Sequence, residues 1–435
     1  MRGERALTSR TAGLKTLRMF IMLVFLAWIV SACSSPPPEP SPQPQPTEAP
    51  EEGQTITLIT PPSNNTNKES GPKYQVQTRI TGFHLLSETE GMVWGVTKNE
   101  LRLYVTHNNG ATWANISPAP NVQFLSTPVY GKGIFFTDSN HGWIIRSAFG
   151  TTENIVLRTT DGGKSWKISS LGDDNNVSSV YFNSPTQGWL MTSANATPNK
   201  ESKTIYSTSD GGATWEEVMQ NEQYNPNLPN HSIPFTGVST GMIFKNRVDG
   251  FVTLQTGALP KIFITKDGGG SWNPGQSFLV NEQLESCDRV ITGKPEFFDA
   301  SKTNGWMSVG CQNDKDKTIT YHGYFTANGG DNWKFAPFEL KSPTEGNHQS
   351  APTFLNSRVG WSIIGNTLYH TVNQGKTWLP LKESSVLRSK LEEYPETIKM
   401  QFISTEVGWL LLEKKEQKRS LLLQTTNGGI SWRVM

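Results

Sequence analysis

Seven short acidic or amide side chains recur along the chain at a fixed place in a repeated pattern. Each occupies the third position of an eight-residue turn motif that has Thr first, Gly fifth and Trp eighth. Regularly spaced carboxylates could bind a metal ion or transfer protons, but three of these residues are Asp and four are Asn. Because an amide serves in most copies, we expect the shared role to be hydrogen-bond acceptance from N–H groups of the turn itself. The residues are Asn108, Asp161, Asp210, Asp267, Asn328, Asn373 and Asn427.

The tryptophans at the eighth position define a repeat. They follow one another at intervals of about 50 residues, the length of four short strands and their turns in a propeller blade. Glycine supplies the positive φ that such a turn needs, and an indole ring can pack between neighbouring sheets. The seven copies predict an all-β fold, a seven-bladed β-propeller with four-stranded antiparallel blades. The tryptophans are Trp113, Trp166, Trp215, Trp272, Trp333, Trp378 and Trp432.

A second motif, Gly followed by an aromatic residue, precedes six of the seven turn motifs, and the first repeat has an irregular version in which Trp94 follows Gly91 by three residues. We expect each blade to begin with an inner strand carrying a Phe, and the Gly-aromatic pair to open the second strand. The last repeat holds all four strands, so closing the ring requires no N-terminal strand, although residues 56–59 or 74–78 could extend its outer edge. The expected inner-strand residues are Phe136, Phe182, Phe244, Phe298, Phe354 and Phe402.

The turn motif resembles the Asp box of BNR repeats, which recurs in sialidases, sortilin-type receptors, xyloglucanases and the photosystem II stability/assembly factor-like proteins. The order of Phe, Gly-Trp and turn motif is most similar to the last group. The resemblance covers roughly residues 73–435 and implies the propeller fold. It implies no particular activity, because the box is a scaffold element in all these families and lies on the face away from the sialidase active site.

A glycoside hydrolase of sialidase-like or xyloglucanase-like type is the alternative that this resemblance raises. A sialidase-like site needs three arginines that converge on a carboxylate, a Tyr/Glu nucleophile pair and an acid. The Arg-Ile-Pro entry motif of sialidases is not intact, because Thr81 stands where Pro is expected. No catalytic residue is therefore carried over, and charged surface loops are the simpler explanation. The loop residues considered are Arg146, Arg289, Arg388, Glu282, Glu285, Asp288, Glu392, Glu393 and Tyr394.

Metal, cofactor and nucleic-acid chemistry have little support in the sequence. The seven histidines show neither HxH nor HExxH spacing, so we predict no metal site. No Gly-rich phosphate loop opens a helix, so we predict no cofactor. With 39 Lys and Arg against 38 Asp and Glu, the net charge is +1, and we expect no nucleic-acid partner.

The first 32 residues have the pattern of a lipoprotein signal peptide. A basic start and an apolar run over residues 19–30 precede small residues and Cys33, and the run is shorter than the ~20 residues that span a bilayer. Resemblance to bacterial lipoproteins implies a diacylglyceryl thioether on Cys33, and thus an extracytoplasmic protein anchored to the cell membrane. A plain secretory signal or an uncleaved anchor stays open. Residues 33–72, rich in Pro, predict a disordered stalk, in which residues 55–60 alternate like a strand.

The two remaining cysteines, Cys287 and Cys311, are an even pair in a compartment where disulfides persist. We expect a disulfide between the connection that follows the fourth blade and the second strand of the fifth. Two separate buried thiols are the alternative, since spacing alone does not show whether the Cα atoms lie within disulfide reach.

The lengths of the connections between blades predict where a binding site lies on the ring. If the turn motifs share one face of the ring, the connections between blades share the other, and four of these are long: 216–238, 273–294, 334–350 and 379–397. Because long loops on a rigid scaffold commonly carry binding sites, we expect a monomeric, non-enzymatic binding or assembly module for a protein, peptide or glycan. Tolerated insertions and a purely structural envelope role are alternatives. Candidate contact residues are Tyr224, His231, Phe235, Arg289, His348 and Tyr394.

Overall fold

The computed structural model describes residues 54–57, 79–118, 122–146, 153–197, 199–221, 231–256, 259–275, 282–343 and 350–435. All of them belong to one compact unit, Glu52–Met435. The predicted signal peptide, Cys33 and most of the predicted stalk lie outside the described residues, as do the candidate contact residues Tyr224 and His348. The described part therefore corresponds to the predicted propeller and one short strand ahead of it.

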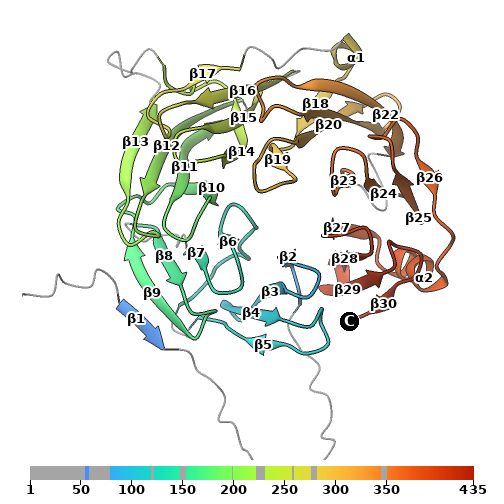
Figure 1. The fold of residues 1–435 in the computed structure, drawn as a ribbon, viewed down its shortest axis with the longest axis horizontal. Coiled ribbons are helices and arrows are strands. Elements are labelled where there is room, and N and C mark those ends of the chain that lie inside the picture. Colours follow the sequence, from blue (N-terminus) through green and yellow to red (C-terminus); the bar gives the residue numbers. More distant parts are fainter. Residues whose placement is uncertain are drawn as a thin grey trace, which may run out of the picture. The chain divides into compact units, whose positions relative to one another are not determined.

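Seven antiparallel sheets surround a central axis, and the first strand of each is innermost (Figure 1). Blade 1 contains β2 (Gly82–Leu85), β3 (Gly91–Thr97), β4 (Glu100–Thr106) and β5 (Ala114–Asn115). Blade 2 contains β6 (Ile134–Phe136), β7 (Gly142–Arg146), β8 (Ile155–Thr159) and β9 (Ser165–Ser170). Blade 3 contains β10 (Asn176–Phe182), β11 (Gly188–Thr197), β12 (Lys200–Thr208) and β13 (Glu216–Asn221). Blades 4 and 5 contain β14 (Val238–Phe244), β15 (Gly250–Thr256), β16 (Leu259–Thr265) and β17 (Asn273–Pro274); and β18 (Arg289–Thr292), β19 (Glu296–Phe297), β20 (Gly305–Asn313), β21 (Thr318–Thr326) and β22 (Lys334–Pro343). Blades 6 and 7 contain β23 (Thr353–Phe354), β24 (Gly360–Ile364), β25 (Thr367–Thr371) and β26 (Leu379–Pro380); and β27 (Glu396–Phe402), β28 (Val407–Lys414), β29 (Arg419–Thr426) and β30 (Arg433–Val434). The predicted seven-bladed β-propeller with four-stranded antiparallel blades is confirmed.

Blade 2 carries an additional outer strand. β1 (Gln54–Thr57) pairs antiparallel with β9, and Ile56 lies opposite Trp166. The sequence had suggested that this segment extends blade 7, and the structure places it on blade 2 instead. The available edges explain the difference, because β9 has six residues to pair with and β30 has two.

The inner strand of blade 5 is interrupted. β18 and β19 both pair with β20, and Pro295, which has no backbone N–H to donate, lies between them. Here the inner-strand aromatic residue is Phe297 and not Phe298, as the spacing had suggested: Phe297 pairs with Gly305, whereas Phe298 already belongs to the turn. The turn before Gly305 is longer than in the other blades, which misled the count from the sequence.

Phe and Gly-Trp residues form the contact between neighbouring blades. Trp143 stacks on Phe182 of the next blade with ring centroids 3.6 Å apart, and Trp189 stacks on Phe244 of the blade after that at 3.7 Å. Within one blade the Phe ring lies against the Gly that opens the second strand, so a Cβ atom at Gly188 would come 2.3 Å from the Phe182 ring. Glycine is required there because the ring approaches the backbone so closely.

In blades 2, 3 and 6 a hydrogen bond links the same aromatic position to a backbone carbonyl in the turn motif of the next blade. The indole Nε1 of Trp189 donates to the carbonyl oxygen of Gly268, the fourth residue of that motif, at 2.8 Å. Blade 4 has Phe251 at this position, which has no N–H group. The carbonyl of Gly329 in the following motif accepts a hydrogen bond from Lys245 Nζ instead, at 2.8 Å. Hydrogen bonds thus connect the two sequence motifs across several of the blade junctions, whereas the indole of Trp94 donates to the carbonyl of Pro128 and that of Trp306 has no partner.

Every copy of the turn motif has the same internal hydrogen bonds. The third side chain accepts from the N–H of the seventh residue, as Asn108 Oδ1 does from Thr112 at 2.8 Å and Asp161 Oδ1 from Ser165 at 3.0 Å. Burial raises the pKa of Asp161, but the hydrogen bonds from Ser165 outweigh it and hold that pKa below its usual value. Asp and Asn can therefore serve the same turn, since each offers an acceptor oxygen.

Side-chain hydrogen bonds close the ring between blades 7 and 1. The carboxamide of Gln401 binds both backbone groups of Leu85: Leu85 N–H donates to Oε1 at 3.1 Å and Nε2 donates to the Leu85 carbonyl at 3.1 Å. Trp409 Nε1 donates to Oδ1 of Asn109 at 2.9 Å, and Gln424 Nε2 donates to the Asn109 carbonyl at 2.6 Å. Each of the two blades keeps four strands from its own segment, as the sequence predicted.

The described helical segments are α1 (Glu282–Glu285), α2 (Ser385–Glu393) and the short 3-10 helix η1 (Lys415–Gln417). The side chain of Ser384 caps α2 by accepting a hydrogen bond from Leu387 N–H. No helix in the described part of the chain is both long enough and apolar enough to span a membrane.

Candidate functional site

The turn motifs lie on one face of the ring together with the turns between first and second strands. In blade 2 the N–H of Gly162, in the motif, donates to the carbonyl of Asn140, in that turn, at 3.0 Å, and in blade 4 Gly268 donates to Val248 at 2.9 Å. Because the strands of each blade are antiparallel, the connections between blades lie on the opposite side. We call the two sides the motif face and the loop face.

A buried lysine holds the connection between blades 3 and 4 on the loop face. Lys203 has no exposed surface, and its ammonium group donates to the carbonyl oxygens of Glu201, Pro234 and Gly237 at 3.1, 3.2 and 2.7 Å. It also lies 3.7 Å from the carboxylate of Glu201, which accepts a hydrogen bond from Ser239 N–H at 2.7 Å. Burial lowers the pKa of Lys203 to about 8, and Glu201 opposes this shift. Lys203 and Glu201, which we call the lysine clamp, fix the end of this connection to blade 3.

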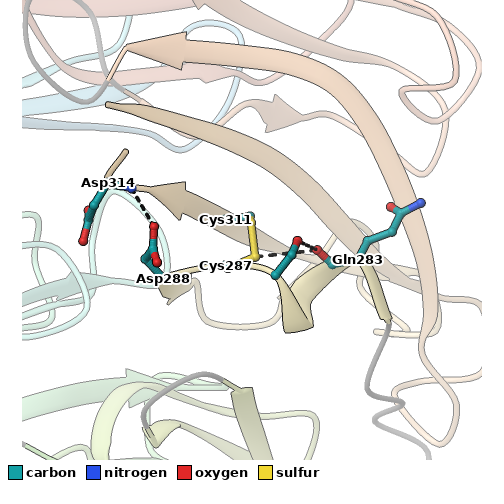
Figure 2. Close-up of a disulfide and its surroundings, with 6 residues drawn as sticks. Gln283, Cys287, Asp288, Cys311 and Asp314 are labelled. Carbon is teal, nitrogen blue, oxygen red and sulfur yellow. Dashed lines mark hydrogen bonds between the residues drawn. A yellow bond between two sulfur atoms is a disulfide. The ribbon is translucent and has the colours of Figure 1, made fainter. Parts of the chain in front are cut away.

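A disulfide holds the connection between blades 4 and 5 (Figure 2). Cys287, which follows α1, is bonded to Cys311 in β20, and their Cα atoms are 5.3 Å apart. Beside it, the carboxylate of Asp288 accepts a hydrogen bond from Asp314 N–H at 2.8 Å. This connection is therefore joined to blade 5 covalently as well as by hydrogen bonds.

Three candidate contact residues lie on these two connections. His231 and Arg289 are exposed, and Phe235 is half-buried. Arg289 opens β18, where the carbonyl of the next residue, Val290, accepts a hydrogen bond from Gln255 Nε2 of blade 4 at 2.6 Å. The three side chains thus project from backbone that is fixed to the scaffold.

Tyr394 does not lie where a contact residue should. It follows α2, is 3% exposed, and packs with Leu387 and Leu391 in a hydrophobic cluster of blades 6 and 7. The guanidinium carbon of Arg419 lies 5.8 Å from its ring centroid. The sequence placed Tyr394 in a long connection, but the helix that forms there turns the ring inward.

Several charged residues considered for a sialidase-like site form local pairs. Along α2, Arg388 pairs with Glu383 at 2.9 Å and with Glu392 at 3.1 Å, and Glu393 pairs with Lys390 at 2.6 Å. Within the described ranges, no three or more His, Cys, Asp or Glu residues are grouped as metal ligands. Arg388 thus forms its ion pairs with nearby residues at the exposed surface of α2.

A group of cationic and aromatic side chains near the ring axis was not found from the sequence. It comes from the inner strands of blades 1, 3 and 7, from the segment before β6, and from the residues around β19 (Figure 1). We call it the axial cluster. Its members are His84, Tyr130, Tyr181, Lys294, Lys302 and Lys399.

Lys399 and His84 meet across the junction of blades 7 and 1. Lys399 Nζ donates to the carbonyl of Phe83 at 2.9 Å and lies 4.9 and 5.4 Å from the ring centroids of Phe83 and Tyr130. The imidazole of His84 stacks on Tyr130 with centroids 3.8 Å apart, and its Nδ1 is buried without a hydrogen-bond partner. Blades 1, 2 and 7 thus contribute to one group of side chains.

Lys294 and Lys302 reach the same region from blade 5. Lys294 passes over Gly241 of blade 4, where a Cβ atom would lie 2.3 Å from its own Cβ, and its Nζ lies 3.0 Å from the position a Cβ would take at Gly131 of blade 2. Lys302 Nζ donates to the hydroxyl of Tyr181 and to a backbone carbonyl of blade 4, both at 2.7 Å. Glycine is required at position 241 because a side chain would displace Lys294, and at position 131 because the backbone has a φ of +79°.

The environment of the axial cluster disfavours positive charge. Burial lowers the pKa of Lys399 to about 7; Glu296 opposes this shift and Lys294 adds to it. Burial lowers the pKa of Lys302 to about 8. The pKa of His84 lies well below its usual value because of burial and the nearby charges of Lys399 and Lys294. No carboxylate of the described residues lies within ion-pair distance of any of the three lysines.

One part of this cluster left a trace in the sequence. In β27, Lys399 and Gln401 alternate with the buried Met400 and Phe402. Because alternate residues of a strand point to opposite sides, polar residues in an inner strand could have been assigned to the axis. Lys294 and Lys302 come from irregular segments, for which no such pattern exists.

These features define a seven-bladed β-propeller in which the lysine clamp and a disulfide fix two connections of the loop face, and in which lysines gather near the axis. A family model described as "Sortilin, neurotensin receptor 3," matches residues 101–226, well under half of the chain. No curated protein matches.

Three solved structures illustrate the likeness in fold. "YCF48 bound to D1 peptide" has 18% identity and a TM-score of 0.47, covering 86% of this chain and 97% of that chain. The GH74 enzyme of Niastella koreensis has 9% identity and a TM-score of 0.28, covering 82% and 71%. The α-L-arabinanase of Penicillium chrysogenum, complexed with arabinobiose, has 12% identity and a TM-score of 0.37, covering 86% and 97%.

Proposed function

We propose that the protein is a lipid-anchored, extracytoplasmic binding or assembly module that engages a protein or peptide through its loop face. The observation that carries this proposal is the lysine clamp. Burying an ammonium group is costly. Here the group bonds the carbonyls of Pro234 and Gly237 in the connection between blades 3 and 4, and that of Glu201 in β12. A connection held in this way loses less conformational freedom when it binds a partner.

The turn motif supports the same proposal. Its hydrogen bonds are those of a structural turn in all seven copies, which fits an Asp box in a BNR repeat. The order of Phe, Gly-Trp and turn motif resembles the photosystem II stability/assembly factor-like proteins. An assembly role of that kind would require a protein or peptide partner.

Replacing Cys33 by serine is expected to release the protein from membranes, since the proposed lipid is attached to that sulfur. The folded part should keep its thermal unfolding midpoint, because the proposed stalk separates it from the lipid. Fractionation of cells that express wild type and Cys33→Ser, combined with metabolic fatty-acid labelling, measures both effects. Fatty-acid label that persists on Cys33→Ser would contradict the anchor.

The partner site is tested by site-specific photo-crosslinking. A photoreactive residue in place of Phe235 or Arg289 is expected to give a discrete protein or peptide adduct in intact cells. The same residue in place of Lys376, which is exposed on the motif face, is the control and should give none. Equal adducts from both faces, or adducts from Lys376 alone, would place the partner away from the loop face.

A further inference from the structure

Beyond the partner site on the loop face, we propose that the axial cluster binds a compact oxyanion. The ligand would be a carboxylate, phosphate or sulfate group, held between the ammonium groups of Lys294 and Lys399 and backed by the stacked rings of His84 and Tyr130.

Several N–H donors of the axial cluster have no acceptor among the described residues. An ammonium group has three N–H donors, and Lys399 uses one of them, on the carbonyl of Phe83. Lys294 makes no hydrogen bond or ion pair with the described residues. His84 adds a buried Nδ1 atom that has no partner and that can donate to an anion in the tautomer with its proton on Nδ1. Buried donors are rarely left unpaired in proteins, and an anion would satisfy these groups together.

Positive charges outnumber negative charges in the axial cluster. Lys294, Lys302 and Lys399 bring three ammonium groups to the axis, and Glu296 is the one carboxylate whose field acts on Lys399. Glu296 is exposed and forms no ion pair with these lysines. Lys302 is already bonded to two oxygen acceptors, so Lys294 and Lys399 are the cations available to a ligand.

The donors that remain available in the axial cluster define the chemistry of the ligand. His84, Tyr130, Lys294 and Lys399 are half-buried, so each keeps some surface that a ligand can reach. The hydroxyl of Tyr130 already donates to the carbonyl of Phe136 at 2.9 Å, so it offers no further donor. Lysine binds oxyanions as a point charge without demanding a planar partner. Two ammonium groups with free donors therefore suit a carboxylate, phosphate or sulfate group.

The proposal predicts opposite effects of one substitution on the free and the bound protein. Burial lowers the pKa of Lys399 to about 7 from its ordinary 10.5. Between these two values the unfolded chain holds a proton that the folded chain lacks, so stability rises with pH over that range. At pH 6 the buried charge is therefore destabilising. Lys399→Met is expected to raise the unfolding midpoint without anion, and to remove the stabilisation that the anion gives.

The test uses the full chain in detergent at pH 6 and constant ionic strength. Isothermal titration and thermal unfolding are measured with inorganic phosphate, sulfate and citrate against chloride, so that the three arms distinguish the oxyanions. Wild type is expected to bind at least one of them, and Lys294→Met and Lys399→Met should each weaken this binding by about tenfold or more. Lys261→Met is the control, because Lys261 is exposed and lies on the third strand of blade 4.

The pH dependence provides a second readout. Affinity for the anion should fall as the pH rises through about 7, because Lys399 then loses its proton. The groups that face it are His84, Tyr130, Lys294 and Glu296. Binding that is no stronger than that of chloride in all three arms would overturn the proposal. So would tight binding that survives in both Lys294→Met and Lys399→Met.

Discussion

Trp189→Ala is expected to lower the free energy of unfolding by about 3 to 5 kcal/mol, the usual cost of truncating a buried aromatic side chain. Trp189 is fully buried, stacks on Phe244 of the next blade at 3.7 Å and donates to the carbonyl of Gly268 at 2.8 Å. The substitution leaves a cavity between blades 3 and 4 and removes the partner of that carbonyl. Urea denaturation followed by circular dichroism measures the loss.

Trp189→Phe separates the two contributions. Phenylalanine keeps an aromatic ring against Phe244 but has no N–H group, so the expected cost is about 1 to 2 kcal/mol, of which the hydrogen bond contributes about 1. A natural counterpart exists in blade 4, where Phe251 takes this position and Lys245 supplies the donor. Equal losses for Trp189→Ala and Trp189→Phe would show that the hydrogen bond, and not the stacking, joins the blades.

Lys203→Met is expected to cost about 2 to 4 kcal/mol and to loosen the end of the connection between blades 3 and 4. Methionine fills a similar volume but leaves three carbonyls without their donor and the Glu201 carboxylate without its cation. Each buried group left unpaired costs about 1 to 3 kcal/mol. Removing the buried charge recovers only part of this loss, because a broken buried ion pair leaves its other member uncompensated.

Hydrogen exchange of residues 231–239 reports the loosening directly. Lys200→Met is the matched control, since Lys200 is exposed on the same strand as Lys203. Faster exchange is expected in Lys203→Met and not in Lys200→Met, together with a weaker adduct from a crosslinker at Phe235. Unchanged exchange in Lys203→Met would mean that other contacts hold the connection, and the lysine clamp would no longer support the proposed function.

Lys203 and Lys399 show why a buried lysine has to be judged by its partners. Burial lowers the pKa of both. Lys203 bonds three carbonyls and faces a carboxylate, so its removal is expected to destabilise the fold. Lys399 bonds one carbonyl, so its removal is expected to stabilise the free protein. The number of hydrogen-bond acceptors around a buried lysine, and not burial alone, thus determines whether its replacement stabilises or destabilises the fold.

The fold could be predicted from the sequence because its determinants are local and repeated. Thr, Asp or Asn, Gly and Trp lie within eight residues of each other, and the side-chain hydrogen bonds of the Thr and of the Asp or Asn form inside that segment. One copy of the motif is weak evidence for a blade, but seven copies at similar spacing predict the number of blades and the order of their strands. Where the repeat varies, the prediction differs from the structure. Phe297 and not Phe298 is the inner-strand residue, because one turn is longer. The segment expected as a possible extension of blade 7 pairs with blade 2, because the motif carries no information on the lengths of exposed edges.

The sites could not be predicted to the same extent because they depend on contacts between distant segments. The axial cluster joins Lys399 to Phe83 and Lys302 to Tyr181, pairs separated by 316 and 121 residues, and neither lysine belongs to a motif. Tyr394 was predicted as a contact residue of a binding loop and is buried, since it packs against Leu387, Leu391 and side chains of blades 6 and 7. By itself the sequence determined the blades, through short-range turns and stacking that each repeat carries. The tertiary structure alone decided which charges meet at the axis, because closing the ring brings together side chains whose separation along the chain has no regular pattern.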